Sequence, residues 1–66
     1  MNTATIILKN GTKISDKISD EESEGLFFAW QEYLKNGKAP DGAIHLNGLK
    51  TCAVVDPRDI SAIVTE

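Results

Sequence analysis

The sequence contains few of the residues that usually hold a very small protein together. Among its 66 residues there is one cysteine, Cys52, so no disulfide can form within the chain. A structural zinc site normally needs four ligands, and the lone His45 together with the lone Cys52 cannot supply them. We therefore predict a protein without a metal site and without a cofactor.

Basic residues are also few. Seven Lys and Arg side chains are outnumbered by ten Asp and Glu side chains, and the formal net charge is −3. Proteins that bind nucleic acids usually carry a clustered basic face, which displaces counterions from phosphates. Here no two basic residues are adjacent in the chain: they are Lys9, Lys13, Lys17, Lys35, Lys38, Lys50 and Arg58. This distribution disfavours a direct role on DNA or RNA.

Long hydrophobic runs and an export signal are missing as well. The first residues, 1–5, carry no positively charged side chain, and no long apolar stretch follows them. This start is not typical of a signal peptide, and nothing in the sequence is long and apolar enough to cross a membrane. With a single thiol in addition, we expect a cytoplasmic protein that does not enter a membrane.

The chain is short for a protein that is stable on its own. It has room for a single domain, residues 1–66, and a domain of this size hides only roughly 60% of the surface that its unfolded chain exposes. Such domains usually need a staple or a partner subunit, although some of them fold alone. We therefore expect a homo-oligomer, another protein partner, or both.

The first part of the chain predicts a β-hairpin. Residues 3–9 are rich in β-branched side chains, and Asn10-Gly11 after them is a strong hairpin signal. We prefer a three-residue loop to a two-residue turn, because it pairs Ile6 with Ile14 and keeps the apolar residues on one face. In that loop Gly11 takes the left-handed position of a bulge.

The middle of the chain predicts one helix from Asp20 to about Asn36. Ser19, followed three residues later by Glu22, has the pattern of a capping box. Acidic residues in the first turn are favoured by the helix dipole. Gly37 is the expected stop at the C-terminal end.

The predicted helix has one apolar side and one anomalous aromatic. At about 100° per residue, the apolar residues that cluster on one side are Leu26, Phe27, Trp30, Tyr33 and Leu34. Phe28 falls on the opposite side. An exposed aromatic there is typical of a contact surface, although single exposed apolar residues are also common. We predict an interaction surface made of Phe28, Glu24, Glu32 and Lys35.

A second hairpin is expected around Asn47-Gly48. We predict a two-residue turn that pairs Leu46 with Leu49. In this register the apolar residues that face one way are Ile44, Leu46, Leu49, Ala53 and Val55.

Together these segments predict an α+β fold with the order β-β-α-β-β-β. Pro57 breaks the fourth strand because it cannot donate to a ladder, and residues 60–64 form a last short strand. We expect one antiparallel sheet of four to five short strands with a single amphipathic helix packed across it. The predicted core consists of Ile6, Leu8, Ile14, Leu26, Phe27, Trp30, Tyr33, Leu34, Ile44, Leu46, Leu49, Ala53, Val55, Ile60 and Ile63.

The whole-chain pattern resembles small proteins of unknown function that are encoded by phages, prophages and related mobile elements. Its pieces are a hairpin at 6–11, the helix at 20–36, a second strand and Asn-Gly turn at 44–48, and a closing proline turn and strand at 57–63. The resemblance implies a hairpin-helix-hairpin (ββαββ) fold and a source of that type. It brings no catalytic residue.

Two pairs of residues have both a chemical and a structural interpretation. His45 and Cys52 would lie on the same outer face of the second hairpin, where a thiol and an imidazole can act as nucleophile and base. No third group that orients them stands at a recognisable spacing, so we expect Cys52 to be a half-buried hydrophobe and the protein not to be an enzyme. Trp30 and Tyr33 could stack on bases, but their helical spacing favours the core.

The function predicted from the sequence is protein binding by a small module that acts by occlusion or scaffolding and associates with itself. The closing strand, 60–64, is a further candidate for contact with a second copy if its edge is uncovered. One alternative is a nucleic-acid-associated regulator, which requires basic residues to converge in space. Another is an acidic decoy that inhibits a DNA-binding enzyme, using the run Asp16, Asp20, Glu21, Glu22 and Glu24, which is more simply a solvated helix start.

Overall fold

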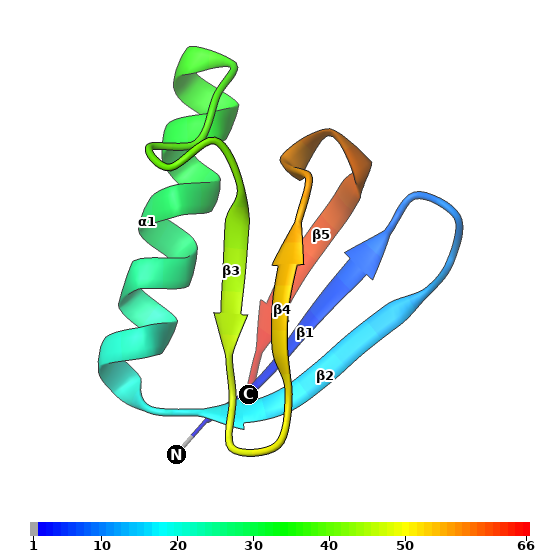
Figure 1. Ribbon diagram of the computed structural model, residues 1–66, viewed down its shortest axis with the longest axis vertical. Helices are drawn as coiled ribbons and strands as arrows, with labels where there is room; N and C mark the ends of the chain where they lie inside the picture. Colours follow the sequence, from blue (N-terminus) through cyan, green and yellow to red (C-terminus); the bar gives the residue numbers. More distant parts are fainter. Residues whose placement is uncertain (1) are drawn as a thin grey trace.

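The structure is a computed structural model that describes residues 2–66; Met1, the first residue of the predicted domain, lies outside them. The described elements contain one α-helix and antiparallel strands, so the fold is α+β as predicted (Figure 1). In chain order the elements are β1 (Asn2–Leu8), β2 (Lys13–Ile18), α1 (Asp20–Asn36), β3 (Ile44–Asn47), β4 (Cys52–Val55), the short 3₁₀-helix η1 (Pro57–Asp59) and β5 (Ile60–Thr65).

β1 and β2 form the first hairpin in the predicted register. Ile6 lies opposite Ile14, and the Leu8 amide donates to the Thr12 carbonyl at 2.8 Å. Gly11 has a φ of 92°, in the left-handed region where a side chain would be strained. The three-residue loop is therefore confirmed, and the residues that determine it lie within the loop.

The caps of α1 are also those that the sequence predicts. The Ser19 hydroxyl accepts a hydrogen bond from the Glu22 amide at 3.2 Å. At the other end, Gly37 has a φ of 78° and its amide donates to the Tyr33 carbonyl at 2.8 Å. Both ends therefore satisfy backbone groups that a helix would otherwise leave without a partner.

The second hairpin, formed by β3 and β4, does not have the predicted two-residue turn. Leu46 lies opposite Ala53 and not opposite Leu49, and the loop spans residues 48–51. The shift from 49 to 53 is even, so alternation keeps the same strand residues on the inner face. Only Leu49 changes its environment, because it moves into the loop, where it is 63% exposed.

Asp16 on β2 fixes this four-residue loop. Its Oδ2 accepts hydrogen bonds from the Lys50 amide at 2.8 Å and the Thr51 amide at 2.6 Å, and its Oδ1 accepts from the Lys17 amide at 2.7 Å. Gly48 lies so close to Asp16 that a Cβ atom at Gly48 would overlap the Asp16 side chain. The pKa of Asp16 is lowered, chiefly because the Lys50 amide stabilises the charged carboxylate.

The strands form two sheets, which corrects the prediction of one sheet of four to five strands. One sheet has the order β2-β1-β5, and the other is the hairpin β3-β4. In Figure 1 the hairpin stands in front of the larger sheet and α1 lies along one side of both. Because the hairpin turns its apolar side toward the larger sheet, it packs against that sheet and does not extend it.

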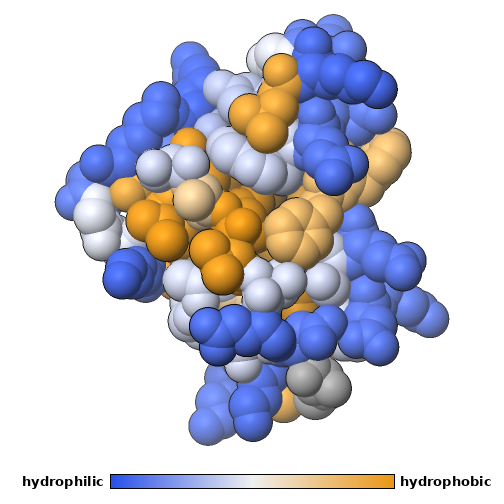
Figure 2. Space-filling model, turned by 180° about the vertical axis from the view of Figure 1, so that it is seen from behind, coloured by the Kyte–Doolittle hydropathy of each residue, from blue (hydrophilic) through white to orange (hydrophobic). Residues whose placement is uncertain are grey.

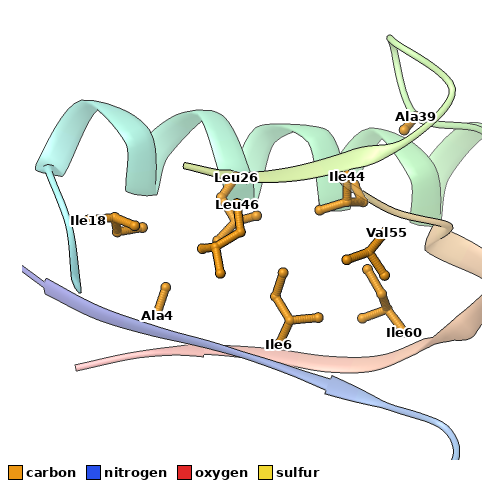
Figure 3. Close-up of a cluster of buried hydrophobic side chains, with 9 residues drawn as sticks. All are labelled: Ala4, Ile6, Ile18, Leu26, Ala39, Ile44, Leu46, Val55 and Ile60. Atoms are coloured by element: carbon orange, nitrogen blue, oxygen red, sulfur yellow. The ribbon is translucent and has the colours of Figure 1, made fainter. Parts of the chain in front are cut away.

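The core lies between the three-stranded sheet and a layer made of α1 and the hairpin (Figure 3). Its buried hydrophobic residues are Ala4, Ile6, Ile18, Leu26, Ala39, Ile44, Leu46, Val55 and Ile60. Half-buried residues that pack against it are Leu8, Ile14, Ala29, Trp30, Tyr33, Ala53 and Ile63. Most of the predicted core is therefore confirmed, while Ala4, Ile18 and Ala39 are core residues that the predicted list omits.

Two predicted core residues are on the surface. Leu34 is 65% exposed and Leu49 is 63% exposed. The buried side of α1 carries Leu26 and Tyr33, and Leu34, one residue beyond Tyr33, turns about 100° away from that side. Phe27 is half-buried and is not among the residues that pack against the core.

Candidate interaction surface

The side of α1 that faces away from the core carries the predicted aromatic. Phe28 is 57% exposed, and together with Gln31, Glu32, Leu34 and Lys35 it lines a shallow depression on the protein surface. Glu24 is exposed one helical turn before Phe28. We call the six residues the outer helix surface: Glu24, Phe28, Gln31, Glu32, Leu34 and Lys35.

The charged groups of the outer helix surface differ in their local partners. Glu32 accepts a hydrogen bond from the Asn36 side-chain amide at 2.6 Å. Glu24 and Lys35 make no ion pair with any residue in the range 2–66, where the only side-chain ion pair joins Arg58 to Asp56 at 2.7 Å. Glu24 and Lys35 are therefore the charges of this surface that are available to a partner.

The structure bears on the predicted surface residues in different ways. Phe28 is exposed as the helical spacing predicts, and Glu32 and Lys35 lie beside it in the same depression. Leu34 and Gln31 also belong to this surface but are absent from the predicted one. Leu34 is among the predicted core residues, and Gln31 is a polar residue without a feature that marks it as a contact. The spacing of three residues between Phe28 and Gln31 places them on neighbouring positions of the helix surface and could have identified Gln31.

A second apolar area lies on the sheet. In the view from behind, hydrophobic side chains gather in the middle of the face and hydrophilic side chains surround them (Figure 2). The outer side of the three-stranded sheet contributes Ile7, Ala62 and Val64, of which Ile7 and Ala62 are half-buried and Val64 is 43% exposed. Phe28 and Leu34 are more exposed than any of these three, so the outer helix surface is the stronger candidate for a contact.

The closing strand β5 is not a bare edge. It is the outer strand of its sheet, since it pairs with β1 alone. However, α1 lies close to β5 as well as to β3. Association of a second copy through β5 therefore stays a prediction.

His45 and Cys52 do lie on the same face of the second hairpin. His45 is opposite Val54 and Cys52 is opposite Asn47, so they are diagonal neighbours, and both are exposed. The expectation that Cys52 is half-buried is therefore wrong. Within the described residues, no hydrogen bond between His45 and Cys52 is formed, and no group of three or more potential metal ligands is found.

Trp30 and Tyr33 pack as the helical spacing predicts. Both are half-buried against the core, and their rings stack on each other with centroids 5.5 Å apart and planes inclined by 17°. Each ring therefore already has an aromatic neighbour within its own chain.

The acidic run that suggested a decoy is divided in the structure. Asp16 is on β2, where backbone amides of the second hairpin occupy its carboxylate, while the other acidic residues lie on α1. Asp20 accepts a hydrogen bond from the Asn2 side-chain amide at 2.9 Å. The Leu49 amide donates to the Lys17 carbonyl at 3.1 Å, so the second loop lies beside the backbone at Lys17.

Asp56 and Arg58 form a local ion pair at the start of η1. The Arg58 guanidinium holds the pKa of the Asp56 carboxyl below its ordinary value, mainly through its side-chain hydrogen bonds. Asp56 also accepts from the Arg58 amide at 2.9 Å and thereby caps the 3₁₀-helix. These residues hold the turn between β4 and β5, which suffices to explain their contacts.

Comparisons with known proteins give no family to which these features can be assigned. None of the described helices is long and apolar enough to span a membrane. No protein-family model, no curated protein and no solved structure matches the chain. The functional argument therefore depends on the chain's own residues.

Proposed function

We propose that this chain is a small, non-enzymatic protein-binding module that contacts its partner through the outer helix surface. Its action would be occlusion or scaffolding, in the cytoplasm, as part of a phage or mobile-element system of the kind that its sequence pattern resembles. The single observation that carries the proposal is Phe28, which is 57% exposed on the side of α1 opposite the core.

The energetic reason is the cost of leaving a large aromatic in water. Complete burial of a Phe side chain stabilises a complex by about 1.5–3 kcal/mol relative to leaving it exposed. Within its own chain Phe28 gains only part of this amount, since more than half of it is accessible. Aromatic residues in the centre of an interface, surrounded by polar groups that exclude water, commonly provide most of its binding energy.

The surrounding residues fit that arrangement. Leu34 adds a second exposed apolar side chain, 65% accessible, to the depression beside Phe28. Glu24 and Lys35 carry opposite charges and would orient a partner more than they would increase its affinity.

The proposal is tested by capture of protein from a nuclease-treated lysate of the source organism. The wild type is compared with Phe28→Glu and with a matched control, Val54→Glu, because Val54 is 70% exposed on the second hairpin. We expect to capture a protein partner, which can be a second copy of the chain. The wild type and Val54→Glu should retain this partner, and Phe28→Glu should lose it.

Two results would contradict the proposal. One is capture that is the same for Phe28→Glu and the wild type, because the outer helix surface would then have no role. The other is the absence of any bound protein together with retention on heparin that is lost at moderate salt, which would favour the nucleic-acid alternative.

A further inference from the structure

Four exposed residues of α1 form a ridge along the helix, and the spacing between them is symmetric. Glu24, Phe28, Gln31 and Lys35 follow each other at intervals of four, three and four residues, and all four are exposed. At about 100° per residue they lie within roughly 60° of each other around the helix. Intervals of this kind are those of the contact seam between two packed helices.

The ridge is complementary to itself when two copies run antiparallel. Reversal of the order four-three-four gives the same order, so Glu24 of one copy meets Lys35 of the other, and Phe28 meets Gln31. A two-fold axis repeats each of these contacts, as in most homodimers. We propose that the partner of the outer helix surface is a second copy of this chain, bound through an antiparallel pair of α1 helices; this inference rests on the proposed function.

The shape of the surface fits this pairing. The depression is lined by Phe28, Gln31, Glu32, Leu34 and Lys35, and the pairing places Phe28 of the second copy against Gln31. Leu34, which is 65% exposed in the same depression, adds apolar surface beside the seam.

The charges favour the antiparallel direction over the parallel one. The first turn of α1 contains Asp20, Glu21 and Glu22, whereas its last turn contains Lys35. In an antiparallel pair the acidic start of each helix lies beside the basic end of the other, and the helix dipoles are also opposed. Glu24 and Lys35 have no ion-pair partner within residues 2–66, so the pairing breaks no existing contact of theirs.

The test reverses the charges of Glu24 and Lys35, singly and together. The dissociation constant of the dimer is measured by sedimentation equilibrium at low salt, at protein concentrations up to about 1 mM. Exposed ion pairs each change an equilibrium by roughly 1.5–5-fold, and the dimer contains the Glu24–Lys35 pair twice. We expect a wild-type dimer, a roughly tenfold or greater weakening in Glu24→Lys and in Lys35→Glu, and recovery to within about threefold of the wild type in the double variant.

The matched control is Glu66→Lys, which makes the same charge change at an exposed residue outside α1. It should leave the dissociation constant within about threefold of the wild type. Circular dichroism of every variant at low concentration shows whether α1 and the strands are intact, so that a failure to fold is recognised separately.

Two outcomes would overturn the inference. The first is a wild type that stays monomeric over the whole concentration range. The second is a dimer in which the double variant is as weak as the single variants, since Glu24 and Lys35 would then not face each other. Neither outcome decides the proposed function, because loss of a different captured protein with Phe28→Glu would still show protein binding through this surface.

Discussion

The two hairpins have similar sequences around an Asn-Gly pair but different loops. In the first, Asn10 and Gly11 lie within the loop, and Gly11 takes a φ of 92°. In the second, Asn47 is the last paired residue of β3, and Gly48 is not among the glycines with positive φ. The same dipeptide therefore occupies the turn in one hairpin and the end of a strand in the other.

The difference arises from what each loop contacts. In the first loop the Asn10 side chain accepts a hydrogen bond from the Thr12 amide at 2.9 Å, a contact between neighbours in the chain. In the second, the carboxylate of Asp16 receives the amides of Lys50 and Thr51 from a distant part of the chain. The residues of a turn determine the shape of its loop when no group from elsewhere in the chain binds the loop amides. A hydrogen-bond acceptor from a distant segment, such as the Asp16 carboxylate, can override that local preference.

Among variants that compare the two loops, the largest loss of stability is expected from Gly48→Ala. An added Cβ would lie only 2.6 Å from the Asp16 Cβ, so the side chain of Asp16 must move away from the loop amides. We expect a loss of about 1–3 kcal/mol in the free energy of unfolding, measured by urea denaturation.

A double-mutant cycle sharpens this prediction. In an Asp16→Gly background the clashing side chain is absent, including its Cβ, and Gly48→Ala should cost much less. Gly25→Ala is the control, because that glycine has open surroundings and alanine there should stabilise the helix by up to about 1 kcal/mol. Equal losses for Gly48→Ala in both backgrounds would mean that Asp16 does not hold the loop.

A somewhat smaller effect is expected from Gly11→Val in the first hairpin. A β-branched residue resists the positive φ that the loop requires, which costs roughly 1–2 kcal/mol. The loss should be independent of Asp16, so it should be the same in the Asp16→Gly background. Urea denaturation of the single and double variants measures both values, and an unchanged midpoint for Gly11→Val would contradict the loop.

The smallest change in stability is expected from Asp16→Asn. This change depends on pH, and it concerns the second hairpin and not the first. The lowered pKa of Asp16 means that its stabilisation is complete above the unfolded-state pKa of about 3.9 and is lost as the pH falls through the lower folded-state pKa. Asp56 has a lowered pKa as well and acts in the same range.

Thermal unfolding between neutral and strongly acidic pH should therefore show a smaller acid loss for Asp16→Asn than for the wild type. Asp41→Asn is the matched control, since Asp41 is exposed and it is the Asp16 carboxylate that accepts from the loop amides. An acid loss that is unchanged by Asp16→Asn would show that this carboxylate is not bound by the loop amides in solution.

The parts of the fold that could be predicted are those determined by nearby residues. Ser19 and Gly37 end the helix through contacts within four residues, and the register of the first hairpin follows from its own loop and apolar pattern. The second loop could not be predicted, because it depends on Asp16, whose role is visible only once β2 and the hairpin are close in space. The two-sheet arrangement could not be predicted either, because it depends on how the apolar side of the hairpin packs against the larger sheet.

The candidate surface was predicted only in part, for a similar reason. The exposure of Phe28 follows from helical spacing, which is a local property. The exposure of Leu34 does not, because it depends on how α1 turns its buried side toward the sheets. Whether Glu24 and Lys35 have partners depends on the whole chain as well.

The contact surface on α1 can be mapped residue by residue with NMR. Amide spectra of the labelled chain are recorded as unlabelled wild-type chain or a captured protein is added. The account predicts shifts or line broadening at Glu24, Phe28, Gln31 and Lys35, with the outer face of the second hairpin unchanged. Changes that cluster instead at His45 and Val54, or none with any protein, would contradict it.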